Sequence, residues 1–334
     1  MTTIYHDADG DLRALRDQTV AIVGYGNQGR SQAQNLRDSG VSVIVGNIRD
    51  AAHEQAEADG FTVYAIAEAC RIADAVLLLI PDEIMPAVYA EHVAPHLSTG
   101  NLLCFASGYN VGFGLIEPAE DLDVVLLAPR MIGIGVRDTY VSGRGFPSFV
   151  GVHRDATGTA RDRLLSLAKA VGSTRAGCID MSMHDEASLD LFTEQAFGPA
   201  FGRVMMSAVE LLIGAGYPPE AVLLELYLSG EFAYSLEKIR EVGMLKQMDF
   251  HSRTSQYGSM TRGARFLDLD GPIKQRMGEV LEQIRDGSFA REWSEAQEGA
   301  GSVLDAIRNA RDQIPFAQWE RDARSALRIG DARD

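Results

Sequence analysis

The residue pattern with the most specific chemistry is a glycine-rich loop, Gly24-Tyr25-Gly26-Asn27-Gln28-Gly29. In the GxGxxG spacing of dinucleotide-binding proteins, the first glycine makes a tight turn and the second lets the backbone approach a pyrophosphate. The third lets a helix pack closely on a strand, and that helix presents unpaired N–H groups to the phosphates. An ordinary tight turn is the alternative. Because a strand-like run, TVAIV, precedes the loop and a helical pattern follows it, the sequence predicts dinucleotide binding.

The segment after the second expected strand bears on which dinucleotide is preferred. An acidic residue there would hold the ribose hydroxyls of NAD, but this chain has Asn47, followed by Arg49 and Asp50. Arg49 would bind the 2′-phosphate of NADP, whereas Asp50 would repel it. A solvated pair of loop charges explains both residues equally well. The sequence therefore leans towards NADP and leaves NAD possible.

Asp190 and Glu194 are four residues apart in an expected helix, so their side chains share one face of it. Carboxylate oxygens at this spacing are hard ligands of the kind that Mg²⁺ takes. Composition alone favours a solvated acidic face. The spacing by itself leaves both interpretations open.

The elements that must position these residues fall into two groups. Up to Met181, apolar runs of strand length alternate with helical patterns, which is typical of a parallel sheet covered by helices on both faces. The expected strands are 19–23, 41–45, 75–80, 102–105, 124–128, 148–152 and 174–179. After Met181 we expect helices over 184–214, 219–241, 270–286 and 303–327. The chain is thus predicted to have an α/β Rossmann domain over 1–181 and an all-α domain over 182–330.

The composition excludes several classes of partner. Lys and Arg number 31 against 47 Asp and Glu, a net charge of −16 that repels nucleic acids and anionic lipids. No apolar run approaches the ~20 residues of a membrane span, and the polar N-terminus resembles no targeting signal. We therefore expect a cytoplasmic protein that acts on a small molecule, without nucleic-acid or membrane partners. The cysteines have no CxxC spacing and are expected to be small buried hydrophobic residues: Cys70, Cys104 and Cys178.

Eight short motifs along the chain together resemble those of the ketol-acid reductoisomerase family, in its short class I form. They are VAIVGYGNQG (20–29), LIPDE (79–83), FASGYN (105–110), APR (128–130), LDLFTEQ (189–195), AGYPPE (215–220), SQYG (255–258) and DGSFAREW (286–293). The resemblance implies an NADPH-dependent enzyme acting on 2-acetolactate-type substrates. An alkyl group migrates with the help of two Mg²⁺ ions, and hydride then reduces the new 2-keto acid. It also implies a Rossmann domain followed by a knotted, all-helical domain, with active sites shared between two subunits.

The resemblance assigns roles to individual residues. Asp190 and Glu194 would be metal ligands, joined by Glu225 from a later helix, and Ser252 would contact the substrate. Arg130 stands at the position of the family's catalytic lysine. The residues assigned to the cofactor site are Gly24, Tyr25, Gly26, Asn27, Gln28, Gly29, Arg49, Pro81, Asp82, Ser107 and Gly133.

Three positions depart from the family pattern. Arg130 replaces a lysine, Ser107 replaces a histidine, and Ser229 replaces the second of two glutamates, of which the first is Glu225. Glu231 is not expected to substitute, since six residues of helix turn it through about 600°, away from Glu225. A hydroxyl is a poor replacement for an anionic ligand, so we expect one Mg²⁺ site at most.

These departures lead to one main hypothesis and two alternatives. Reduction of a small keto acid, ketone or imine is expected to survive, whereas alkyl migration is expected to be lost or severely impaired. In that case Asp190 and Glu194 would hold one metal ion or relay a proton, and Arg130 would bind an anionic group or the developing oxyanion. The alternatives are a genuine ketol-acid reductoisomerase and a dinucleotide-binding protein without catalysis. The apolar faces of the helical domain exceed what one small domain buries, so we also expect a homodimer or a larger homo-oligomer.

Overall fold

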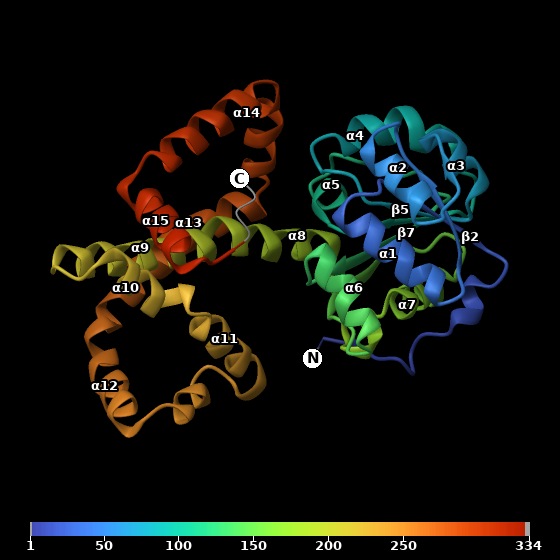
Figure 1. Ribbon diagram of the computed structural model, residues 1–334. Helices are drawn as coiled ribbons and strands as arrows, with labels where there is room; N and C mark the ends of the chain where they lie inside the picture. Colours follow the sequence, from blue (N-terminus) through green and yellow to red (C-terminus); the bar gives the residue numbers. More distant parts are fainter. Residues whose placement is uncertain (1, 331–334) are drawn as a thin grey trace. The chain divides into compact units, whose positions relative to one another are not determined.

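The computed structural model describes residues 2–330, and the chain divides into two compact units, Met1–Asp190 and Leu191–Asp334. The division falls within α8 (Met183–Phe192), whereas the sequence placed the boundary at residue 181. The first unit is an α/β domain and the second is helical (Figure 1). Both parts of the predicted fold class are confirmed.

Within the described residues, nine strands form a single sheet in the order β1-β9-β8-β7-β6-β5-β2-β3-β4. The run from β4 to β7 is parallel and has the strand order of a dinucleotide-binding domain. Its strands are β2 (Thr19–Val23), β3 (Ser42–Gly46), β4 (Val63–Tyr64), β5 (Ala75–Leu78), β6 (Leu102–Phe105) and β7 (Asp123–Pro129).

The other edge of the sheet departs from the parallel arrangement that the sequence predicted. β8 (Ser148–Arg154) is antiparallel to β7, β9 (Cys178–Asp180) is parallel to β8, and β1 (Ile4–Tyr5) is antiparallel to β9. The expected strand over 174–179 is wrong in its first residues, because Ser173–Arg175 form a 3₁₀ turn. Strand direction depends on which neighbour a strand pairs with, and apolar patterning does not encode that partner.

Successive strand residues alternate between two buried cores. In β2, Val20 and Ile22 face the core beneath α1 (Asn27–Asp38) and α7 (Ala160–Val171), and Ala21 faces the opposite core. The opposite core is covered by α3 (Ile66–Ile72) and α4 (Met85–Val88). All three cysteines are buried, and burial raises the pKa of each thiol to about 12, which confirms their expected role as small hydrophobic residues: Cys70, Cys104 and Cys178.

Two of the long helices that the sequence predicts for the second unit are interrupted in the structure. The helix expected over 219–241 is interrupted at Gly230, whose φ of +81° is left-handed. It consists of α10 (Pro219–Leu223), the π turn Leu224–Leu228 and α11 (Glu231–Val242). The helix expected over 303–327 is also two helices, because Pro315 cannot donate the hydrogen bond that would continue the first one. The remaining helices are α9 (Gly198–Gly214), α12 (Arg253–Gly263), α13 (Asp270–Arg285), α14 (Ser288–Asp312) and α15 (Pro315–Leu327).

One continuous helix, Met183–Gly214, is long and apolar enough to cross a membrane by length and composition, and 11% of its most apolar stretch is buried. The expectation that no part of the chain approaches a membrane span was therefore wrong. One such helix is weak evidence for a membrane, since apolar helices also occur in folded protein interiors. Among the described residues of the second unit, a small cluster of buried apolar side chains is formed by Val209, Val222, Leu223 and Ala323.

Candidate active site

The loops that carry the expected cofactor residues lie at one edge of the sheet, beyond the carboxyl ends of its parallel strands. β2 lies between β3 and β5, so the strand order reverses at the β2–β5 pair. In open α/β sheets, ligands bind in the crevice formed at this point of reversal. The loops after β2, β5, β6 and β7 all begin at this edge, at residues 24, 79, 106 and 130.

The glycine loop after β2 has the geometry that its spacing predicts. Gly24 has a φ of +93°, and a Cβ atom there would lie 2.6 Å from the carbonyl oxygen of Leu79. A Cβ at Gly29 would lie 1.9 Å from the carbonyl oxygen of Gly24, so the helix packs too closely for any side chain. At Gly26, nothing lies within 4 Å of that position. Gly26 is also the N-cap of α1 and makes no side-chain cap bond, so space and backbone donors remain available to a phosphate.

Tyr25, which was expected to contact the cofactor, has its side chain in the core. The ring is 3% exposed and packs edge-on against Phe61, and the hydroxyl donates to Asp59 at 2.9 Å. Burial, with Asp59 adding to it, raises the pKa of Tyr25. The backbone N–H of Tyr25 donates to Oδ1 of Asn47 at 3.2 Å. The side chain of Tyr25 therefore anchors the loop in the core.

Two neighbouring residues of the loop hold it against the segment after β7. Nε2 of Gln28 donates to the carbonyl oxygen of Met131 at 2.9 Å. A Cβ at Gly133 would lie 2.2 Å from the carbonyl oxygen of Asn27, so the start of α6 (Gly133–Val141) touches the start of α1. Gln28 and Gly133 therefore lie where the glycine loop packs against the segment after β7.

The segment after β3 leaves Arg49 exposed and binds Asp50 locally. Asp50 caps α2 (Ala51–Ala58) by accepting from the backbone N–H of His53 at 3.0 Å, and it also accepts from Nδ2 of Asn47 at 2.8 Å. Arg49 forms no ion pair within residues 2–330 and lines a hollow of about 570 Å³ together with Asn47 and His53. The carboxylate that was expected to oppose a 2′-phosphate is thus engaged in two hydrogen bonds.

A buried asparagine that the sequence did not single out joins the loops after β5 and β6. Asn110 is fully buried, and its Nδ2 donates to the backbone and side-chain oxygens of Asp82 at 3.2 and 3.1 Å. Ser107 accepts a hydrogen bond from the backbone N–H of Tyr109 at 3.2 Å, immediately before the short helix α5 (Tyr109–Gly112), whose N-cap is Gly108. The carbonyl oxygen of Pro81 accepts hydrogen bonds from backbone N–H groups at the start of the next turn. These loops are tied together at the edge that carries the glycine loop.

Arg130 directly follows β7 and contacts two carboxylates of α8. Its Nη1 lies 2.6 Å from Oδ1 of Asp190, and its Nη2 lies 2.7 Å from Oε1 of Glu186. Glu186 is fully buried and also accepts from the backbone N–H of Gly108 at 2.6 Å. Burial raises the pKa of Glu186 to about 7. Sequence reasoning missed Glu186, although it precedes Asp190 by four residues, at the spacing that drew attention to Asp190 and Glu194.

The other expected site residues belong to the second unit. Glu194 and Glu225 are both exposed and lie in π turns, Thr193–Phe197 and Leu224–Leu228. Ser229 accepts a hydrogen bond from the backbone N–H of Glu231 at 3.3 Å. No unbroken helix relates Glu231 to Glu225 as expected, because the helix ends before Gly230. Ser252 is the N-cap of α12 and accepts from the backbone N–H of Ser255 at 3.2 Å.

The expected ligand set for a two-magnesium site lacks one of its carboxylates. Among the described residues of either unit, no three His, Cys, Asp or Glu side chains come together as metal ligands would. Asp190, the expected ligand in the first unit, is already bonded to a guanidinium. The position of a further anionic ligand carries the hydroxyl of Ser229. We therefore derive no step of the chemistry through magnesium.

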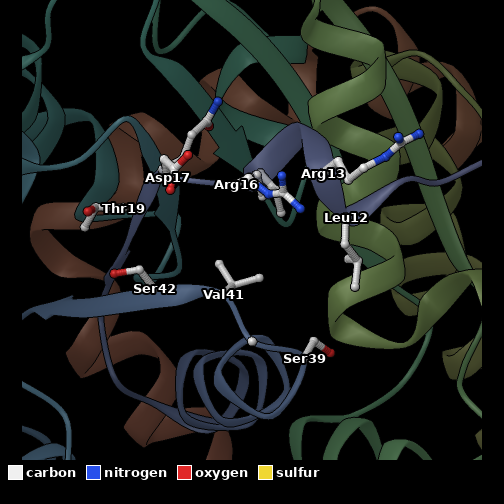
Figure 2. Close-up of a pocket in the computed structure, with 11 residues that line it drawn as sticks. Leu12, Arg13, Arg16, Asp17, Thr19, Ser39, Val41 and Ser42 are labelled. Atoms are coloured by element: carbon white, nitrogen blue, oxygen red, sulfur yellow. The ribbon is translucent and has the colours of Figure 1, made fainter.

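A separate hollow of about 500 Å³ lies at the opposite edge of the sheet, where β2 and β3 begin (Figure 2). Figure 2 shows Leu12 and Val41 directed into it, with Arg16 and Asp17 on its rim. This hollow is remote from the glycine loop along both strands and does not belong to the candidate active site.

Comparisons with known proteins agree with the fold. A family model described as the NADPH-binding domain of acetohydroxy acid isomeroreductase matches residues 14–177, and one for the C-terminal domain of ketol-acid reductoisomerase matches residues 183–328. The chain is 44% identical to the ketol-acid reductoisomerase (NADP(+)) of Methanopyrus kandleri, over 92% of this chain and 93% of the relative. It is 40% identical to that of Pyrococcus abyssi, over 91% of each chain.

A solved structure gives the same result. An NADH-preferring ketol-acid reductoisomerase from an uncultured archean superimposes with a TM-score of 0.90 at 33% identity, covering 97% of this chain and 98% of the other. The family matches cover both units, and the relatives extend over almost the full length of the chain. The chain therefore belongs to the ketol-acid reductoisomerase family of NAD(P)-dependent oxidoreductases.

Proposed function

We propose that this chain reduces a small keto acid, ketone or imine with NAD(P)H, and that alkyl migration is lost or severely impaired. The observation that carries the proposal is the contrast between the two halves of the chemistry. The glycine loop has an open position at Gly26 and a free helix N-terminus for the cofactor phosphates. The acidic set is depleted, with Ser229 in place of a carboxylate and Asp190 bonded to Arg130.

The two halves have different physical requirements. Hydride transfer needs a positioned nicotinamide, a polarised carbonyl or imine and a source of a proton. Alkyl migration in this family relies on two metal ions that grip and polarise the substrate oxygens. Loss of anionic ligands therefore affects migration far more than reduction.

The experiment separates the two steps by supplying each substrate in turn. Purified protein, Mg²⁺ and NADPH are mixed either with 2-acetolactate or with the rearranged 3-hydroxy-2-keto acid, and absorbance of the reduced nicotinamide is followed. We expect oxidation of NADPH with the rearranged acid and little or none with 2-acetolactate. Comparable turnover of 2-acetolactate, abolished by EDTA, would reject the proposal.

We propose NADPH as the favoured cofactor. Arg49 is exposed beside the hollow that follows β3, and the neighbouring Asp50 is engaged as a helix cap. A guanidinium binds phosphate oxygens in a bidentate manner, which suits the 2′-phosphate of NADP. The relatives are divided, since two are named for NADP(+) and the structural neighbour is described as NADH-preferring. NADH therefore remains an alternative cofactor.

A genuine ketol-acid reductoisomerase is the second candidate. Two curated relatives carry that name at 40–44% identity over at least 91% of this chain, which is high similarity for proteins of different activity. In that case Arg130, Ser107 and Ser229 would be tolerated substitutions. The acetolactate assay above decides between the two candidates.

We propose that a second copy of this chain covers the apolar surface of the second unit. An apolar groove of about 620 Å³ lies between the start of α9 and α13, with Phe197, Phe201 and Ile273 among its lining residues. Leu211 and Leu245 are 74% and 88% exposed in the single chain. Exposed apolar area of this extent marks an interface, and homo-oligomers with twofold symmetry are the commonest solution. Light scattering should give at least twice the mass of the chain, and a stable monomer would contradict the proposal.

We further propose that the protein works in the cytoplasm on a small-molecule substrate, without nucleic-acid or membrane partners. The net charge of −16 opposes binding to nucleic acids and anionic lipids. The apolar helix Met183–Gly214 is accounted for by the subunit interface just proposed.

A further inference from the structure

The guanidinium of Arg130 lies between two carboxylates that project from one face of α8. Nη1 is 2.6 Å from Oδ1 of Asp190 and Nη2 is 2.7 Å from Oε1 of Glu186. Residues four apart on a helix stack along the same face, so the two carboxylates form a pair that one cation can bridge. Arg130 thus binds both carboxylates and offsets one of their two negative charges from inside the protein.

The position of Arg130 is fixed on several sides. Its guanidinium lies 5.0 Å from the ring centroid of Phe149, within the range of a cation–π contact. Its Nε is buried, and its partner Glu186 is held from the other side by the backbone of Gly108. The Arg130 side chain is 27% exposed and Glu186 is fully buried. Such a guanidinium has little freedom to leave.

A guanidinium differs from the lysine ammonium that the family pattern has at this position. Arginine stays protonated at all relevant pH values and offers a planar fork that satisfies two carboxylates at once. An ammonium is a compact, strongly hydrated charge on a flexible stem, so it vacates a carboxylate more readily. A divalent ion that approached Asp190 would have to displace a charge-assisted hydrogen bond and would meet the positive charge of Arg130.

We propose that Arg130 is a resident cation that binds Glu186 and Asp190 and competes with any divalent ion for Asp190. Its single positive charge offsets one of the two negative charges without metal, and Asp190 is withdrawn from metal coordination. The inference deepens the proposed function, on which it rests for the idea that the chain works with a depleted metal site. Its test measures metal binding rather than turnover, so the two can fail separately.

The test uses Mn²⁺ as the probe, because electron paramagnetic resonance of free Mn²⁺ reports how much is bound. Full-length wild type is compared with Arg130→Lys, which restores the family residue, and with Arg130→Gln, which removes the charge. We expect both variants to bind Mn²⁺ roughly tenfold more tightly or better, since an ion pair no longer competes for the carboxylate. Adding Asp190→Asn to either variant should abolish the gain.

Arg137→Lys is the matched control. Arg137 also pairs with an aspartate, at 2.6 Å from Asp38, also approaches an aromatic ring, and is also 27% exposed. It should bind Mn²⁺ as wild type does. Thermal melting establishes that each variant is folded, and with two substitutions at Arg130 one misfolded variant does not end the test.

Equal Mn²⁺ affinity in wild type and the folded Arg130 variants, at any level, would overturn the inference. A gain that survives Asp190→Asn would overturn it as well. Reduction of a keto acid by wild type, measured separately, decides the proposed function independently of either result.

Discussion

The backbone N–H of Gly108 donates a hydrogen bond of 2.6 Å to Oε2 of Glu186, across 78 residues of sequence. This bond connects the loop after β6, where the family pattern has a histidine and this chain has Ser107, to the acidic face of α8. A Cβ at Gly108 would lie 1.9 Å from the carbonyl oxygen of Met183, so only glycine allows this approach. Glu186 is thereby placed at the centre of the candidate site.

Glu186 should make stability depend on pH. Burial raises its pKa from 4.5 to about 7, so folding favours the protonated carboxyl. The free energy of unfolding should therefore carry the full contribution of Glu186 below about pH 4.5 and lose it as the pH rises through about 7. Removing the carboxyl with Glu186→Gln should remove this loss, on the order of 3 kcal/mol at most. The free energy of urea unfolding, measured from acid to neutral pH, gives the slope.

The exposed Glu120→Gln variant controls for the loss of one carboxyl. If wild type and Glu186→Gln changed in parallel over this range of pH, burial of Glu186 would not be the cause.

Two glycines of the nucleotide loop should respond differently to alanine. Gly26→Ala should fold as wild type does, because nothing lies within 4 Å of the new Cβ, but should bind NADPH at least roughly tenfold more weakly because the methyl group fills the phosphate position. Gly29→Ala places a Cβ 1.9 Å from the carbonyl oxygen of Gly24 and should lower the melting temperature. Calorimetric titration and thermal melting distinguish the two effects. NADPH binding by Gly26→Ala at wild-type affinity would place the phosphates elsewhere.

Arg49 should discriminate between the two nicotinamide cofactors. Arg49→Ala is expected to raise the KM for NADPH by roughly tenfold, the value of one charged phosphate contact, and to leave the KM for NADH nearly unchanged. The matched control is Arg144→Ala, an exposed arginine of the same unit without a role in this loop. Equal changes for the two cofactors would show that Arg49 does not contact the 2′-phosphate.

The interruption of the helix expected over 219–241 should depend on the left-handed backbone of Gly230. Its φ is +81°, so Gly230→Ala should destabilise the protein by about 1 kcal/mol, although no atom lies within 4 Å of the new Cβ. Gly214→Ala, at the end of α9, meets equally open space and should be neutral or stabilising by up to about 1 kcal/mol. Chemical denaturation of both variants provides the comparison. Equal effects would mean that backbone conformation at residue 230 does not limit stability.

Local sequence patterns were sufficient to predict much of the fold of the first unit. The roles of Gly24 and Gly29 follow from spacing, because a tight turn and a close helix–strand contact each need a missing side chain at a set offset. The strand of Thr19–Val23 and the buried cysteines follow from apolar patterning in the same way. The two helix interruptions that the sequence prediction missed in the second unit also had local signals, since Gly230 and Pro315 both mark helix ends.

The cofactor-binding half of the protein can be predicted from the amino-acid pattern, because its signals are short-range and repeat with the period of a strand or a helix. The contacts of Arg130 cannot be predicted in this way. Its partners Glu186 and Asp190 are 56 and 60 residues away, and no local pattern states that β7 ends opposite that face of α8. Burial and charge in the folded protein determine this pairing, since they bring an arginine beside two carboxylates. There the arginine is a fixed cation.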